Sequence, residues 1–158
     1  MPPDQKDIIE LRKKITAGEI DPRAFFEMLN QHSHNGLIGV QFVANADNWV
    51  ELAIDYDEKL IGDPRTGILA SGPIISLCDM ASGMCVMLTT GKFLQTVTID
   101  LRVDYLRPAK VGNRVTGHME CYKHTRNVAF VRGYAHDGDA DSPIANVTGT
   151  FMFLGAPQ

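Results

Sequence analysis

The run from Ser71 to Thr90 constrains the fold of this chain more than any other segment. As a helix it would extend over about five turns, or about 30 Å, and its apolar residues would lie on every side. Such a helix is normally surrounded by the rest of its domain. A membrane span is the alternative, but Ser, Thr, Gly and Asp keep the apolar runs short. Ser71 can cap this helix, Pro73 lies in its first turn, and Gly91 with Lys92 predicts its end.

Asp79 is the single charged residue of this run. Burying a carboxylate without partners is costly, so Asp79 must be paired, protonated or in contact with a solvated cleft. Two roles remain open on this ground. Asp79 can be a structural residue held by backbone N–H groups or by an Arg, or a general base or nucleophile in a mostly apolar pocket. The segments around the helix favour the second role.

The composition limits the class of protein. With 158 residues, of which 44% are hydrophobic, the chain is expected to form one domain with a sizeable core. A net charge of -4 and a pI near 5.7 argue against a nucleic-acid-binding surface and against binding to anionic membranes. The three cysteines are odd in number and lack C-x-x-C spacing, which predicts reduced thiols in a cytoplasmic protein and no metal site. Because no apolar run follows Met1, we expect neither a signal peptide nor an anchor.

Strand patterns flank the central run. Residues 37–44 and 49–56 are joined by turn-forming residues and predict a hairpin, which a loop at residues 57–67 connects to the helix. From Thr96 to Leu106, polar and apolar residues alternate without a break, which predicts a strand with all its polar side chains on one face. Three further strands are predicted, and their short connections indicate an antiparallel meander. They are residues 114–123, 128–135 and 144–154.

Two short helices are predicted before the first strand. Residues 7–17 have an amphipathic pattern, and Asp21 followed by Pro22 opens the second helix, so that both could cover an edge or an entrance of the main body. Residues 32–35 contain two histidines without other clustered ligands and predict a solvated loop. One helix cannot be buried all round by a flat sheet, so we expect an α+β fold in which a curled antiparallel sheet surrounds one long central helix.

Two motifs carry a resemblance to a known family. The first, Gly67-Ile-Leu-Ala-Ser-Gly…Leu-Cys-Asp79, resembles a Gly-x-Leu-His-Gly-Gly…Leu-x-Asp run. The second, Tyr105-Leu-Arg-Pro-Ala109, resembles a Tyr-Leu-Arg-Pro-Ala run. Both are found in acyl-CoA thioesterases of the phenylacetate-degradation type, within the 4-hydroxybenzoyl-CoA thioesterase superfamily. The resemblance implies a hotdog fold for residues 37–158, with residues 1–36 as a helical extension, and hydrolysis of an acyl-CoA thioester to free acid and CoA without a cofactor or metal.

The resemblance also implies roles for single residues. Asp79 would be the catalytic carboxylate, and Gly72 would offer its backbone N–H, at the helix start, to the thioester oxygen. The chain departs from the family pattern where Ala70-Ser71 replaces His-Gly, so an imidazole is absent. A slower enzyme, a different substrate and an inactive relative all fit this loss. Ser71 could contact the substrate, and Asp63 could fill a polar position that is often Asn in relatives.

The resemblance further implies a homodimer or homotetramer with its active site at the subunit boundary, where exposed sheet edges favour association. Asp79 would then face Thr96 or Thr98 of the partner subunit, although each Thr can also be an ordinary strand residue. The phosphates of CoA require cations, for which Arg107 and Arg126 are candidates together with Lys92 and Lys110. Singly, each of these cations also fits an ordinary surface position.

Two other functions remain open on the sequence. A hotdog dehydratase or hydratase would be expected to place a His beside its acid, and no His lies in residues 70–90. A non-catalytic protein that binds acyl thioesters fits the missing imidazole. Met80, Met84 and Met87 form a stripe along the helix, for which core packing is expected rather than an acyl tunnel.

Overall fold

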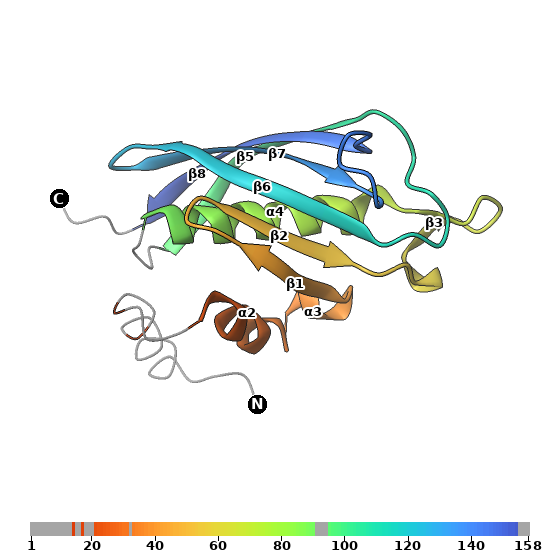
Figure 1. The fold of residues 1–158 in the computed structure, drawn as a ribbon, viewed down its shortest axis with the longest axis horizontal. Coiled ribbons are helices and arrows are strands. Elements are labelled where there is room, and N and C mark those ends of the chain that lie inside the picture. The colour runs from red at the N-terminus through yellow and green to blue at the C-terminus, as the bar shows by residue number, and fades with distance from the viewer. Residues whose placement is uncertain (1–13, 15–16, 18–20, 32, 91–94, 155–158) are drawn as a thin grey trace.

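The computed structural model describes residues 14, 17, 21–31, 33–90 and 95–154. Its main feature is an antiparallel six-stranded sheet in the order β1-β2-β6-β7-β8-β5 (Figure 1). Alternate residues of β6 and β8 are buried, as expected for strands with one face on a core. The strands are β1 Val40–Asn45, β2 Trp49–Ile54, β5 Gln95–Tyr105, β6 Val115–His124, β7 Val128–His136 and β8 Ala145–Leu154.

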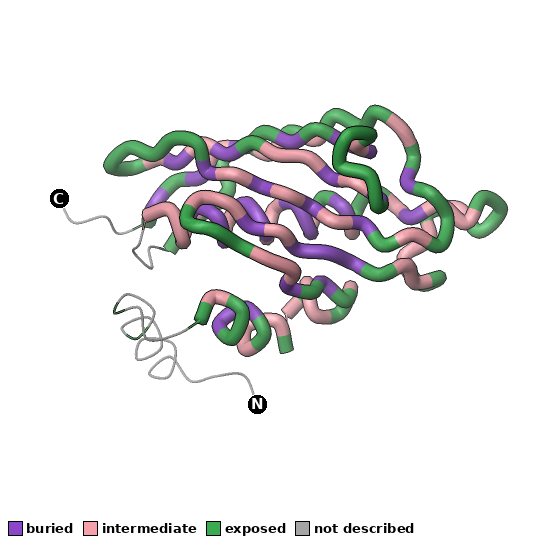
Figure 2. Tube along the Cα trace, in the orientation of Figure 1, coloured by how far each residue is buried: buried purple, intermediate pink, exposed green. Residues whose placement is uncertain are grey.

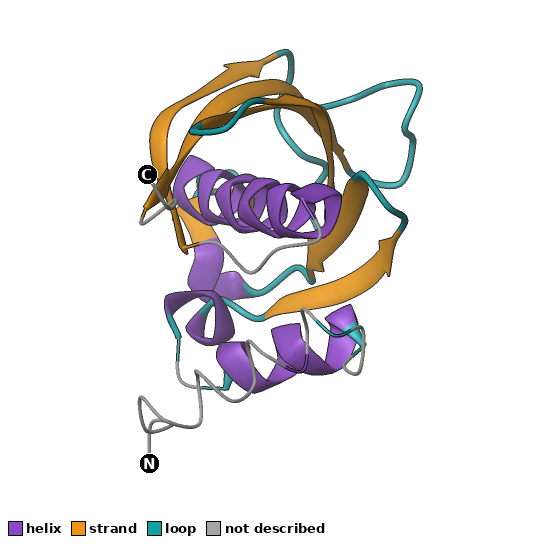
Figure 3. Ribbon diagram, turned by 90° about the vertical axis from the view of Figure 1, so that its left-hand side faces the viewer, coloured by secondary structure: helices purple, strands orange, loops and turns teal. Residues whose placement is uncertain are grey.

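Helix α4, Ser71–Thr90, is the predicted central helix. The sheet curves around the helix and leaves one side of it without strands (Figure 3). By length and composition α4 could cross a membrane. In this fold it packs mainly against β6 and β2, and its inward residues belong to the hydrophobic core. The predicted α+β architecture with a curled sheet around one helix is therefore confirmed.

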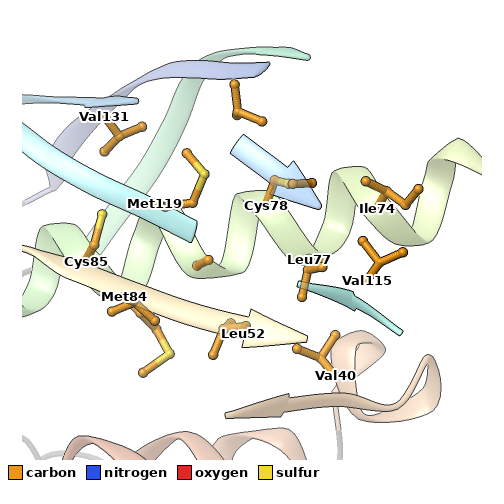
Figure 4. Packing of buried hydrophobic residues seen from close by; sticks show 14 of the residues in the cluster. Val40, Leu52, Ile74, Leu77, Cys78, Met84, Cys85, Val115, Met119 and Val131 are labelled. Atoms are coloured by element: carbon orange, nitrogen blue, oxygen red, sulfur yellow. The ribbon is translucent and has the colours of Figure 1, made fainter. Parts of the chain in front are cut away.

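The core lies between α4 and the concave face of the sheet. Leu77, Cys78 and Cys85 project from α4 toward Val115 and Met119 of β6 (Figure 4), and all five are buried. Buried positions are concentrated on α4 and the strands beside it, and the outer turns are exposed (Figure 2). Met84 also lies in this core, which confirms core packing for that member of the methionine stripe.

The strand order differs from the predicted meander at one place. Strands β6, β7 and β8 are sequential neighbours, but β5 pairs with β8, and β6 pairs with β2. The connection from β5 to β6 therefore passes from one edge of the sheet to an interior position. This order leaves β1 and β5 at the two edges.

Strand β5 contains a β-bulge that the alternating sequence does not indicate. Thr98 pairs with Phe151, but Asp100 pairs with Thr150, so Ile99 is the extra residue. Before the bulge, Thr98 lies on the same face as the buried Phe151; after it, Val103 lies on the same face as the buried Val147. The prediction that all polar residues of this strand share one face is therefore wrong.

The N-terminal helices are partly as predicted. Helix α2, Pro22–Asn30, begins after Asp21, whose side chain accepts a hydrogen bond from the Arg23 N–H, and it packs against the edge strand β1. The helix predicted at residues 7–17 falls almost entirely outside the described residues. The loop predicted at residues 32–35 is wrong for its described part, because Ser33 caps a short helix, α3, His34–Leu37.

The predicted loop before α4 also contains regular structure. It includes the 3-10 helix η1, Glu58–Leu60, and a small two-stranded sheet of β3, Ile61–Asp63, and β4, Ile68–Leu69. The Ala70 N–H donates to the Leu60 carbonyl at 2.8 Å, which fixes the chain just before α4.

A buried ion pair ties the β5–β6 connection to the β7–β8 connection. The Arg107 guanidinium donates to both carboxylate oxygens of Asp137 at 2.7 and 2.8 Å. The Lys110 N–H donates to the same carboxylate at 2.8 Å. The Asp137 side chain is completely buried. The hydrogen bonds from Arg107 and Lys110 hold the pKa of Asp137 well below its usual range.

Candidate active site

One face of α4 lies outside the hydrophobic core and remains available for chemistry. Gly72, Ser76, Asp79 and Gly83 are spaced so that they share this face, and none of them is fully buried. Cys78, next to Asp79 in the chain, is about 100° away around the helix and is completely buried. Asp79 is therefore half-buried at the boundary of the core, which resolves the difficulty of placing a carboxylate in an apolar helix.

Thr98 of β5 holds the Asp79 carboxylate. The Thr98 hydroxyl donates a hydrogen bond to Asp79 Oδ1 at 2.8 Å. The β-bulge at Ile99 makes this contact possible, because it turns Thr98 toward the helix. The contact lies within one chain, so the expectation that Thr98 reaches Asp79 from a partner subunit is wrong for this pair. Among the described residues, Asp79 has no ion-pair partner.

The start of α4 is open to solvent. Ser71 is the first helical residue rather than the cap that we expected, and its carbonyl accepts a hydrogen bond from the Tyr105 hydroxyl at 3.1 Å. Burial raises the pKa of Tyr105 to about 12, so its phenol remains a donor in neutral solution. Gly72 is exposed, and a Cβ at this position would meet no atom within 4 Å. Its N–H is one of the first four of the helix, which have no partner within the helix.

His34 is a residue near Asp79 that the sequence analysis did not assign to the site. Its Nε2 lies 3.1 Å from the hydroxyl oxygen of Ser76, one helical turn before Asp79. Residues 70–90 contain no His, as noted from the sequence, but the fold brings His34 to this helix from another segment. No local pattern identifies this contact, because it depends on how α3 packs against α4.

Several predicted substrate-binding residues lie elsewhere or have other partners. Asp63 forms a bidentate pair with Arg65, with a shortest distance of 2.8 Å. Arg107 is held by Asp137, so its guanidinium is not a free cation for CoA. Arg126 lies in the β6–β7 hairpin, at the opposite end of the sheet from the start of α4 (Figure 1). Thr96 pairs with the buried Phe153 and so shares the inward face with Thr98.

The donor set at this site is not that of a metal centre. Within the described ranges, no group of three or more His, Cys, Asp or Glu side chains is arranged to hold a metal ion. Among the described residues, the site contains the Asp79 carboxylate, the hydroxyls of Ser76, Thr98 and Tyr105, the His34 imidazole and the free N–H groups of a helix start. This set can transfer a proton and can stabilise an oxyanion.

A curled antiparallel sheet around one long central helix is the hotdog fold. Comparison with known proteins gives the family. Residues 66–144 match the Thioesterase superfamily, and the chain belongs to it. The resemblance noted in the two sequence motifs is thereby confirmed.

Individual relatives agree with this assignment. The medium/long-chain acyl-CoA thioesterase YigI of Salmonella typhimurium is 30% identical over 131 residues, which cover 75% of this chain and 83% of YigI. A crystal structure from Pseudomonas aeruginosa is 34% identical with a TM-score of 0.73, and the match covers 84% of this chain and 96% of that one. The E. coli PaaI protein from the phenylacetic acid degradation operon has the same fold, with a TM-score of 0.73 at 14% identity over 92% of this chain and 97% of PaaI.

Proposed function

We propose that this thioesterase hydrolyses an acyl-CoA to the free acid and CoA, with Asp79 as the reacting carboxylate. The observation that carries the proposal is the state of Asp79: it is half-buried on the open side of α4, is hydrogen-bonded by Thr98 at 2.8 Å, and has no cation beside it among the described residues. A carboxylate held in this way is oriented but not neutralised, which suits a base or a nucleophile.

Two routes are compatible with this arrangement. In the first, Asp79 takes a proton from water while the water oxygen bonds to the thioester carbon; the C–S bond then breaks, and the thiolate of CoA recovers the proton. In the second, Asp79 itself attacks the carbonyl carbon, CoA leaves, and water hydrolyses the resulting anhydride. In both routes the Gly72 N–H would stabilise the oxyanion, as the free N–H groups of a helix start can. Thr98 would hold Oδ1, which directs Oδ2 toward the substrate.

We propose a medium or long acyl chain as the preferred substrate. The printed name of the YigI relative supports this class. The surface of α4 next to Asp79 supports it as well, because Ile75 is 40% exposed and the partly buried Met80 and Met87 flank the same face. Apolar surface of this kind gains free energy when an alkyl chain covers it.

We propose that a second copy of the chain completes the site. Strand β5 is an unpaired edge, and its residues Val97 and Ile99 are 37% and 56% exposed. An exposed edge strand with apolar side chains is suited to pairing with another chain. Thr96 would line the site from this strand, and Ser71, Lys110 and Arg126 remain candidates for binding the rest of CoA. The free, buried cysteines support a location in the cytoplasm.

The test is a panel of acyl-CoAs of increasing chain length, with release of CoA thiol as the readout. The wild type should hydrolyse medium and long chains, and Asp79→Asn should lower kcat by at least about 100-fold with an unchanged unfolding temperature. Asp100→Asn, an exposed carboxylate on the edge strand β5, is the matched control and should retain activity. Single-turnover hydrolysis in ¹⁸O-water separates the routes, since label enters the Asp79 side chain only if a covalent intermediate forms.

Two other results of the same assays would indicate a different function. Tight binding of acyl-CoA without thiol release, by wild type and Asp79→Asn alike, would indicate a non-catalytic acyl-thioester-binding protein. Hydration of an enoyl-CoA without hydrolysis would indicate a hydratase, the rival for which His34 beside α4 provides a specific reason.

A further inference from the structure

The position of His34 is fixed by the turn that carries it. Ser33 caps α3 by accepting a hydrogen bond from the Gly36 N–H at 3.2 Å. The side chain of Asn30, at the end of α2, donates to the Val40 carbonyl at 2.7 Å and so ties both sides of this turn together. A side chain at position 36 would collide with the Asn30 carbonyl, so Gly36 is required for this close approach. His34 is therefore presented by a short helix that these contacts hold in place, and not by a solvated loop.

The target of His34 is the stretch of α4 between the two proposed reactive groups. Ser76 follows Gly72 by four residues and precedes Asp79 by three, so all three lie on the same face of the helix. The 3.1 Å contact between His34 Nε2 and Ser76 Oγ therefore places an imidazole beside the path from the oxyanion donor to the carboxylate. Ser76 lies on α4 itself, between Gly72 and Asp79, whereas His34 reaches it from α3, so a substrate lying along this face would contact the Ser76 hydroxyl directly.

We propose that His34 is a positioning residue of the thioester site: it orients the Ser76 hydroxyl, and Ser76 hydrogen-bonds the thioester group between Gly72 and Asp79. This inference rests on the proposed hydrolysis at Asp79 and assigns to it two residues of the chain. The imidazole comes from the N-terminal extension, so residues before the first strand are required for catalysis as well as for covering the edge strand β1.

The experiment compares four variants with the wild-type enzyme on an acyl-CoA that the wild type hydrolyses. His34→Leu removes the hydrogen bond but keeps side-chain bulk, His34→Gln keeps a polar group at the position of Nε2, Ser76→Ala removes the partner, and the fourth variant combines His34→Leu with Ser76→Ala. We expect His34→Leu and Ser76→Ala each to lower kcat about tenfold with KM changed less than twofold, as for the loss of one hydrogen bond made in the transition state. His34→Gln should restore kcat to within about threefold of the wild type. The double variant should be no slower than the slower single variant, because the two residues act as one unit.

The control and the contrary results are specific. His124→Leu, at the exposed end of β6, should leave kcat unchanged. A His34→Leu enzyme as fast as His124→Leu, or fully additive effects of the two single variants, would overturn the inference. The inference would also be overturned if His34→Leu and His34→Gln lost the same amount of kcat as each other and the same amount of unfolding temperature as each other, since a purely structural contact gives that result. Asp79→Asn in the same assay distinguishes the two proposals. If Asp79→Asn abolishes turnover while the His34 variants hydrolyse the substrate as fast as the wild type, the proposed function stands and this inference fails.

Discussion

Replacing Asp137 by Asn should destabilise the fold more than any other isosteric change at a charged side chain of the described residues. The Asp137 carboxylate is completely buried and accepts hydrogen bonds from Arg107 at 2.7 and 2.8 Å and from the Lys110 N–H at 2.8 Å. Asn has the same shape but only one acceptor oxygen, so its NH₂ group would face donors. Removing one partner of a buried ion pair costs about 3–5 kcal/mol, because the other charge is left without compensation.

The Arg107 side chain retains 26% exposure, so water can solvate part of the stranded guanidinium. We therefore expect Asp137→Asn to lower the free energy of unfolding by about 3 kcal/mol, which for a chain of this length lowers the unfolding temperature by about 6–12 °C. Urea and thermal unfolding at one fixed protein concentration measure both quantities, because association would otherwise shift them. Asp139→Asn, two residues away and exposed, is the matched control and should change stability by less than about 0.5 kcal/mol.

The pH dependence provides a second, independent check. The pKa of Asp137 in the folded chain lies below its ordinary value of 3.8, so its stabilising effect is present above pH 3.8 and is lost as the pH falls toward the folded-state pKa. The stability difference between wild type and Asp137→Asn should therefore be constant from pH 7 to pH 5 and shrink by about 1 kcal/mol by pH 3. A difference below about 0.5 kcal/mol at pH 7, or one that does not shrink in acid, would refute the assignment of Asp137 as an ionised structural residue.

Three further predictions concern the site and the core. Thr98→Val should lower kcat about tenfold, because it removes the hydroxyl that holds Asp79. The control Thr148→Val, on the outer face of β8, should leave kcat unchanged, and equal rates for the two variants in the thiol-release assay would contradict the role of Thr98. Gly133→Ala should lower the free energy of unfolding by at least about 3 kcal/mol or prevent folding, because its Cβ would collide with the His118 carbonyl and lie 2.6 Å from Met119 Sδ. Gly83→Ala, with open space at its Cβ, should fold and have the unfolding temperature of the wild type. Burial raises the pKa of Cys78 to about 12 and that of Cys85 further, so neither thiol should react quickly with a disulfide reagent at pH 8 until guanidinium unfolds the chain; fast labelling of either one in the native protein would contradict their burial.

The central helix and the strands could be predicted from the sequence because their signals are local. The described extent of α4 agrees with the predicted run from Ser71 to Thr90, because an apolar run with Ser71 and Pro73 at its start needs no tertiary information. The predicted end at Gly91 and Lys92 lies outside the described residues. Asp79 could be selected for a related reason. One charge in such a run must have a special environment wherever the helix is placed, so its importance could be inferred before its neighbours were known.

The neighbours of Asp79 could not be predicted, because each depends on contacts between distant segments. His34 reaches Ser76 across 42 positions of the chain. Arg107 was a reasonable candidate for a phosphate ligand at the end of a strand, but a carboxylate 30 positions later binds it. Local patterns identify the charged groups, but only the folded chain determines which of them are already paired.

The β-bulge at Ile99 connects the sheet to the chemistry. Side chains alternate between the two faces of a strand, so one extra residue transfers every later side chain to the other face. Without the bulge, a β5 that kept Leu101 and Val103 on the inward face would turn Thr98 outward, and the Asp79 carboxylate would meet the apolar Ile99 instead. With the bulge, one half of β5 supplies apolar residues to the core and the other half supplies a hydroxyl to the carboxylate at 2.8 Å. The single defect in the most regular strand is therefore what allows a charged residue to remain on the central helix.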